Sequence, residues 1–129
     1  MASKKKLCLI VDDQEFDRSM MRRVFAHEWP DFPLVIARNL EEARARLAEG
    51  DIGMVFLDNV LPDGMGIDFV QEMSTSDRMK SVPVVLVSDF PTPFMHAKAK
   101  AANVYEVWSK RQFAVPALSR VMKRAALMV

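Results

Sequence analysis

The sequence predicts an α/β protein in which a parallel sheet is covered by helices on both faces. Short apolar runs alternate along the chain with segments whose apolar residues recur at helical spacing. The apolar runs are almost continuous, which is typical of strands that are buried on both faces. Connections between parallel strands are right-handed, so successive helices can reach both faces of one sheet.

Five apolar runs are predicted to be the strands. The first contains Cys8, the only cysteine, which we expect to be a buried and unreactive thiol. The third places Asp58 directly after its last apolar residue. The predicted strands cover residues 7–11, 34–37, 54–57, 84–87 and 104–108.

Five helices are predicted to alternate with these strands. Asn39, with Glu42 three positions later, has the pattern of a capping box at the start of the second helix. Pro91 and Pro93 suit the first turn of the fourth helix, and Asn103 suits a left-handed end. The predicted helices cover 16–25, the segment between Asn39 and Gly50, 67–73, a segment with Pro91 and Pro93 in its first turn that ends at Asn103, and 116–127.

Length and composition indicate one globular domain that spans residues 1–129, with a flexible start at 1–5. Of the 129 residues, 50% are hydrophobic and 27% charged, and the net charge is +1. This balance gives no reason to expect direct binding to nucleic acid or to an anionic membrane. No apolar stretch approaches the ~20 residues of a membrane span, and no secretory leader is recognisable. We therefore expect a cytoplasmic protein.

Polar side chains follow four of the five predicted strands. Asp12 and Asp13 follow the first, Asp58 the third, Ser88 the fourth and Lys110 the fifth. Each has an ordinary explanation when taken alone, such as a helix cap for Asp12 or Asp13, or a turn for Asp58. In open α/β sheets, however, ligands bind beyond the carboxyl ends of the strands. Their shared position at this edge of the sheet favours a functional site.

These residue types suit the transfer of a phosphoryl group to a carboxylate. Three aspartates in a small space repel one another unless a cation joins them. Mg²⁺ prefers one or two carboxylates together with waters and phosphate oxygens. Asp58 is the candidate nucleophile, because an aspartate can form an acyl phosphate. Lys110 would supply a positive charge, and Ser88 a hydroxyl donor, to the phosphoryl oxygens.

The order and spacing of these residues resemble the receiver domains of two-component response regulators, over nearly the whole chain. The matching parts are the Asp12-Asp13 pair, the run FLDNVLPDGMG at 56–66, Ser88 and Lys110. The intervals from Asp13 to Asp58, on to Ser88 and on to Lys110 are 45, 30 and 22 residues. The resemblance implies a flavodoxin-like fold with the strand order 2-1-3-4-5.

The resemblance also implies the roles of the site residues. Asp58 would be phosphorylated by a sensor histidine kinase or a phosphotransfer protein, and a changed surface would be recognised by a downstream protein. Asp13 and Asp58 would bind Mg²⁺ directly, Asp12 mainly through water, and the backbone carbonyl of Val60 would be a further ligand. Such a domain is a phosphoacceptor with at most slow autodephosphorylation, and we do not expect an enzyme.

Three places depart from the family pattern. Arg111 follows Lys110 where the family usually has proline, so we expect a different loop geometry there. Val107 stands where an aromatic switch residue is common, so we expect activation without the usual coupling between hydroxyl and aromatic ring. The segment 89–91 (Asp-Phe-Pro) follows the serine, and we expect Phe90 to shield the phosphoryl group and alter dephosphorylation.

Other functions on this fold fit less well. A phosphatase with an aspartyl intermediate needs a second acid near the nucleophile, whereas Asn59 and Val60 follow Asp58. A flavin carrier needs a Ser/Thr/Gly-rich phosphate loop after the first strand, where this chain is acidic. The main alternative is a receiver-like interaction domain that signals without phosphorylation, which Val107 and Arg111 favour. We expect a complete single-domain regulator rather than a piece of a longer protein.

Overall fold

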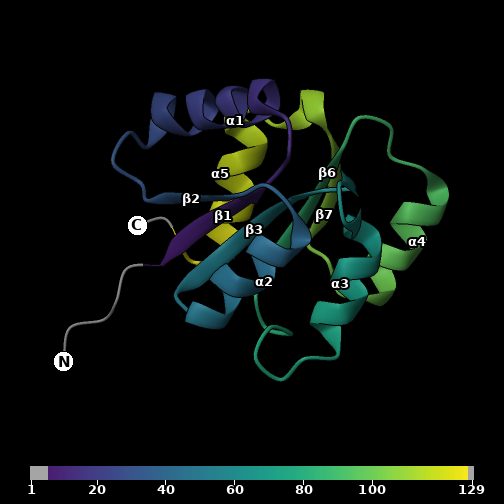
Figure 1. Ribbon diagram of the computed structural model, residues 1–129. Helices are drawn as coiled ribbons and strands as arrows, with labels where there is room; N and C mark the ends of the chain where they lie inside the picture. Colours follow the sequence, from purple (N-terminus) through teal and green to yellow (C-terminus); the bar gives the residue numbers. More distant parts are fainter. Residues whose placement is uncertain (1–5, 128–129) are drawn as a thin grey trace.

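The structure is a computed structural model that describes residues 6–127 (Figure 1). The segment 1–5, expected to be flexible, lies outside the described residues. The sheet consists of β1 (Leu7–Val11), β2 (Leu34–Ala37), β3 (Ile52–Asp58), β6 (Val84–Ser88) and β7 (Glu106–Ser109). All neighbours are parallel, in the order β2-β1-β3-β6-β7. This is the order 2-1-3-4-5 among the five sheet strands, so the predicted fold class is confirmed.

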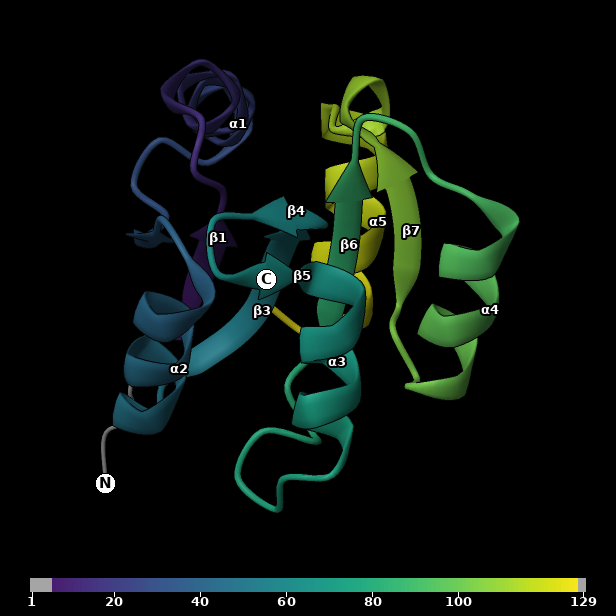
Figure 2. The ribbon, with the colours of Figure 1, turned by 45° about the vertical axis from the view of Figure 1, so that its right-hand side comes forward.

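The helices cover both faces of the sheet. They are α1 (Glu15–Glu28), α2 (Leu40–Glu49), α3 (Gly66–Ser74), α4 (Pro93–Ala101) and α5 (Val115–Arg124). Helices α1 and α5 pack on one face, whereas α2, α3 and α4 pack on the other. In Figure 2 the helix α3 lies in front of the sheet, α4 lies to the right of β7, and α5 lies behind the sheet. No helix within residues 6–127 is both long and apolar enough to cross a membrane.

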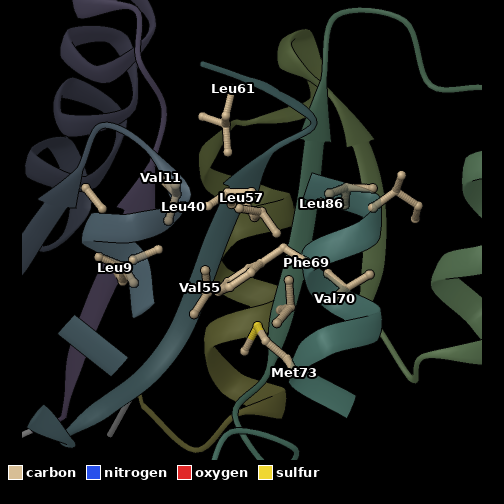
Figure 3. Packing of buried hydrophobic residues seen from close by; sticks show 14 of the residues in the cluster. Leu9, Val11, Leu40, Val55, Leu57, Leu61, Phe69, Val70, Met73 and Leu86 are labelled. Carbon is tan, nitrogen blue, oxygen red and sulfur yellow. The ribbon is translucent and has the colours of Figure 1, made fainter. Parts of the chain in front are cut away.

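The strands divide their side chains between two apolar cores because successive residues point to opposite faces. Val55 and Leu57 of β3 point toward α3, where they meet Phe69 and Met73 (Figure 3). The intervening Phe56 points to the other face, toward α1 and α5. Strand β3 is buried along its whole length, so its last residue is held firmly at the carboxyl edge of the sheet.

Aromatic rings fill the core beneath α1 and α5. The Phe56 ring lies 5.8 Å from that of Phe25 and 5.2 Å from that of Phe113, both edge to face. Trp108 of β7 closes the cluster, 5.9 Å from Phe113. Such pairs contribute about 0.5–1.5 kcal/mol each beyond their burial. The cluster therefore fixes β7 against β3, which places the residue after β7 near the end of β3.

The last strand begins two residues later than the sequence predicts. Asn103 has φ 59°, as its predicted role at the end of α4 requires. The Val104 N–H donates to the carbonyl of Ala99, so Val104 still belongs to the end of the helix. Strand β7 then covers Glu106–Ser109 instead of 104–108.

A short hairpin next to β3 was not predicted. It consists of β4 (Val60–Leu61) and β5 (Gly64–Met65). At its tip, the Asp63 carboxylate accepts hydrogen bonds from the backbone N–H of Leu40 at 2.8 Å and of Glu41 at 3.0 Å. Asn39 also caps α2, as predicted, by accepting from Glu42 N–H at 2.8 Å. The start of α2 is thus tied to the hairpin.

Candidate functional site

Three carboxylates meet at the carboxyl edge of the sheet. Asp12 and Asp13 follow β1, and Asp58 ends β3. One oxygen from each lies within 4.8 Å of the other two. Asp12 is fully buried and Asp58 is 9% exposed, whereas Asp13 is half-buried. Carboxylate oxygens in such a group are suitable ligands for a hard divalent cation, so the cluster could hold a metal ion.

Glycine and asparagine hold the backbone of Asp58 in place. The Gly66 N–H donates to the carbonyl of Asn59 at 2.7 Å, and the Ile67 N–H donates to the Asn59 side chain at 2.9 Å. A Cβ on Gly66 would lie 2.3 Å from the carbonyl oxygen of Asp58. Only glycine permits this close approach, so the start of α3 packs directly against Asp58.

Lys110 reaches this site from β7. Its Nζ donates to Asp12 Oδ2 at 2.6 Å and to Asp17 Oδ2 at 2.8 Å, and it lies 3.7 Å from Asp58 Oδ1. Lys110 begins a 3₁₀ turn, η1 (Lys110–Gln112). The Gln112 side chain accepts from the Ser109 N–H at 2.7 Å and closes a capping box. This turn occupies the place where the family pattern has proline after the lysine.

The electrostatics of the site follow from burial. Burial raises the pKa of Asp58 to about 6, although the charge of Lys110 opposes the increase. Burial also raises the pKa of Asp12 above its usual range, against the hydrogen bond from Lys110. For Lys110 the effect of burial is outweighed by its hydrogen bonds to Asp12 and Asp17, which raise its pKa. The ammonium therefore stays charged, and ionised Asp58 is destabilised without a further cation.

Asp13 and Asp58 line a cavity of about 800 Å³. Ser88, at the end of β6, is buried at its edge, and its hydroxyl accepts from the Phe90 N–H at 3.3 Å. Large apolar side chains that are between 41% and 85% exposed surround the opening. We call them the apolar rim. The rim consists of Phe16, Val60, Met65, Phe90 and Phe94. Every exposed large apolar side chain within residues 6–127 thus faces the same cavity.

The structure brings the six residues selected from the sequence to one edge of the sheet. Asp12, Asp13, Asp58 and Lys110 converge, and Ser88 and Val60 line or border the same cavity. Sequence reasoning missed Asp17, the second partner of Lys110. Its only signal was its place in the first turn of the first helix, where acidic residues are common.

Val107 stands where the family commonly has an aromatic switch residue, and the two aromatic residues nearest to it in the sequence lie elsewhere. Val107 is half-buried and packs on the core beneath α2, α3 and α4. Trp108 points to the opposite core, as strand alternation requires. Tyr105 lies outside β7, with the Arg124 guanidinium 3.9 Å from its ring centre. Neither aromatic residue therefore occupies the position of Val107.

Comparison of the sequence with known protein families finds a match to a family model. The model of the response regulator receiver domain matches residues 8–121. A curated relative, the transcriptional regulatory protein DpiA of Escherichia coli K12, is 32% identical over 68 residues. That match covers 52% of this chain and 30% of DpiA, so the chain spans less than a third of the matched relative's length.

Solved structures share the fold at low identity. The phosphorylated cyanobacterial phytochrome response regulator RcpA has a TM-score of 0.80 and 18% identity, with 95% of each chain covered. The Mn²⁺-bound form of response regulator Rcp1 has a TM-score of 0.78 and 20% identity, with 96% of each chain covered. A CheY-like receiver domain from Methanospirillum hungatei has a TM-score of 0.81 and 16% identity, with 95% of each chain covered. The family match over residues 8–121, together with this fold, shows that the chain belongs to the response regulator receiver domain family.

Proposed function

We propose that this domain is a phosphoacceptor of a two-component system, with Asp58 as the residue that is phosphorylated. The observation that carries the proposal is the position of Asp58. Its carboxylate ends a buried strand, faces an open cavity and has the ammonium of Lys110 at 3.7 Å. The donor would be a phosphohistidine on a sensor kinase or a phosphotransfer protein. We propose no turnover of other substrates, apart from slow loss of the phosphoryl group.

The acidic cluster fits a Mg²⁺ ion. Asp12, Asp13 and Asp58 supply hard oxygen donors within 4.8 Å of one another. Burial and the neighbouring charge of Asp12 raise the pKa of Asp58, and a bound cation would oppose both effects. Asp13 and Asp58 would hold the ion, with Asp12 acting mainly through water and the Val60 carbonyl as a further ligand. When bound, the ion neutralises the carboxylates and the incoming phosphoryl oxygens.

The chain's own residues account for the remaining chemistry. A carboxylate oxygen of Asp58 attacks phosphorus, so a P–O bond forms while the P–N bond to the donor imidazole breaks, and the nitrogen keeps the electron pair. Lys110 stabilises the negative charge on the phosphoryl oxygens, and Ser88 donates its hydroxyl hydrogen to one of them. Ser88 can make this donation while its oxygen still accepts from the Phe90 N–H, because a hydroxyl both donates and accepts. Partner recognition would use the apolar rim, since exposed apolar side chains around a site favour a protein contact.

Mass spectrometry tests the proposal directly. The protein is incubated with Mg²⁺ and acetyl phosphate, and its intact mass is compared with that of an Asp58→Asn variant. We expect a labile gain of one phosphoryl group in the wild-type protein and none in the variant. Absence of the gain with several acyl phosphate donors would favour the alternative, an interaction domain that signals without phosphorylation.

A further inference from the structure

Asp17 lies next to the proposed acceptor without belonging to its acidic cluster. It is in the first turn of α1, and its Oδ2 accepts a hydrogen bond from Lys110 Nζ at 2.8 Å. The side chains of Asp17 and Lys110 are 20% and 10% exposed, so solvent screens this ion pair only in part. The pair therefore contributes to where the ammonium of Lys110 rests.

The hydrogen bonds of Lys110 are divided unequally among its three neighbours. An ammonium has three N–H donors. Two are directed at Asp12 and Asp17, at 2.6 and 2.8 Å. Asp58 Oδ1 lies 3.7 Å away, too far for a hydrogen bond. In this state the ammonium is bound on the α1 side of the site and only approaches the acceptor.

The two carboxylates that hold Lys110 respond differently to a cation. Asp12 is one of the three residues whose oxygens converge, so a bound cation would neutralise part of its charge. Asp17 is outside that group. Its attraction for Lys110 would persist after the cation binds. Of the two hydrogen-bonding partners, Asp17 is thus the one that keeps competing with a phosphoryl group for the ammonium.

We propose that Asp17 is a positioning residue that restrains Lys110 in the unphosphorylated state and thereby weakens binding of a phosphoryl group at Asp58. The inference rests on the proposed acceptor function. An interaction made in one state and weakened in another shifts the equilibrium toward the first state. Asp17 would therefore lower the fraction of phosphorylated protein at a given donor supply.

Beryllofluoride, an analogue of the phosphoryl group, tests the restraint without catalytic turnover. Its dissociation constant at saturating Mg²⁺ is measured by calorimetry for the wild-type protein and for Asp17→Asn. The variant keeps the size and an acceptor oxygen but loses the charge. We expect it to bind beryllofluoride about three- to tenfold more tightly, as expected for release of a partly screened ion pair. Asp17→Glu, which restores the carboxylate, should return the dissociation constant toward the wild-type value.

Asp68→Asn provides the matched control. It removes another lysine ion pair, Asp68 with Lys98 at 3.2 Å, outside the site, and its dissociation constant should equal that of the wild-type protein. If the wild-type protein binds beryllofluoride and Asp17→Asn binds it with the same or a higher dissociation constant, the proposed restraint is overturned and the acceptor function is left intact. No binding by the wild-type protein, Asp17→Asn or the control overturns the acceptor function and this inference together.

Discussion

Replacing Asp58 with asparagine should make the metal-free protein more stable at neutral pH. Burial raises the pKa of Asp58 from its ordinary 3.8 to about 6. Because one pKa unit corresponds to about 1.4 kcal/mol, ionised Asp58 costs the folded state about 3 kcal/mol. A folded-state pKa above the unfolded value means that the cost is absent below pH 3.8. It develops as the pH rises toward 6 and is fully present above pH 6.

Urea unfolding in the presence of EDTA measures this effect, with Trp108 in the core as the fluorescent reporter. At pH 7.5, Asp58→Asn should unfold with a free energy up to about 3 kcal/mol higher than that of the wild-type protein, and at pH 5 the difference should fall to about half. Asp31→Asn, at an exposed position, should change stability at neither pH. The reasoning is refuted if Asp58→Asn is no more stable at pH 7.5, or if its advantage does not shrink on acidification.

Four further results are expected. Mg²⁺ at 100 times its dissociation constant should stabilise the wild-type protein by about 2.7 kcal/mol in urea unfolding; identical midpoints in Mg²⁺ and EDTA would rule out the metal site. Gly66→Ala should destabilise by about 1–3 kcal/mol, because its Cβ would lie 2.3 Å from the Asp58 carbonyl oxygen. In the same denaturation assay, Gln71→Ala at an exposed position of α3 should change the free energy of unfolding by less than about 0.5 kcal/mol. A similar loss of stability in Gly66→Ala and Gln71→Ala would contradict the steric argument. Asn39→Ala should lower the free energy of unfolding by about 1 kcal/mol through loss of the cap on α2. An unchanged stability would mean that Asp63 alone is enough to cap this helix. Phe90→Ala should shorten the lifetime of the acyl phosphate by admitting water; an unchanged lifetime, or equal shortening in the exposed His96→Ala control, would disprove shielding.

Much of the fold and of the site could be predicted because the signals are local. The run 54–57 is apolar throughout, and a strand buried on both faces requires this pattern. Once the strands were located, the shared edge of a parallel sheet predicted that Asp12, Asp58 and Lys110 would come close. The geometry confirms that proximity.

The remaining features depend on contacts between distant segments. Asp63 caps a helix 23 positions earlier in the chain, and no local pattern distinguishes such a cap from an ordinary turn residue. Asp17 binds a lysine 93 positions away, so its role appears only when α1 and β7 are placed together. The late start of β7 depends on how α4 ends, because Val104 donates its N–H back to the helix.

The position of Lys110 has a consequence for how the protein matures. Lys110 contacts Asp12 across 98 positions of the chain, and it follows β7, which lies at the edge of the sheet. During synthesis the three aspartates leave the ribosome well before their counter-charge does. A nascent chain that ends before β7 carries the acidic cluster without the ammonium that compensates it. On the proposed function, competence to accept a phosphoryl group would arise only once the edge strand has docked against β6.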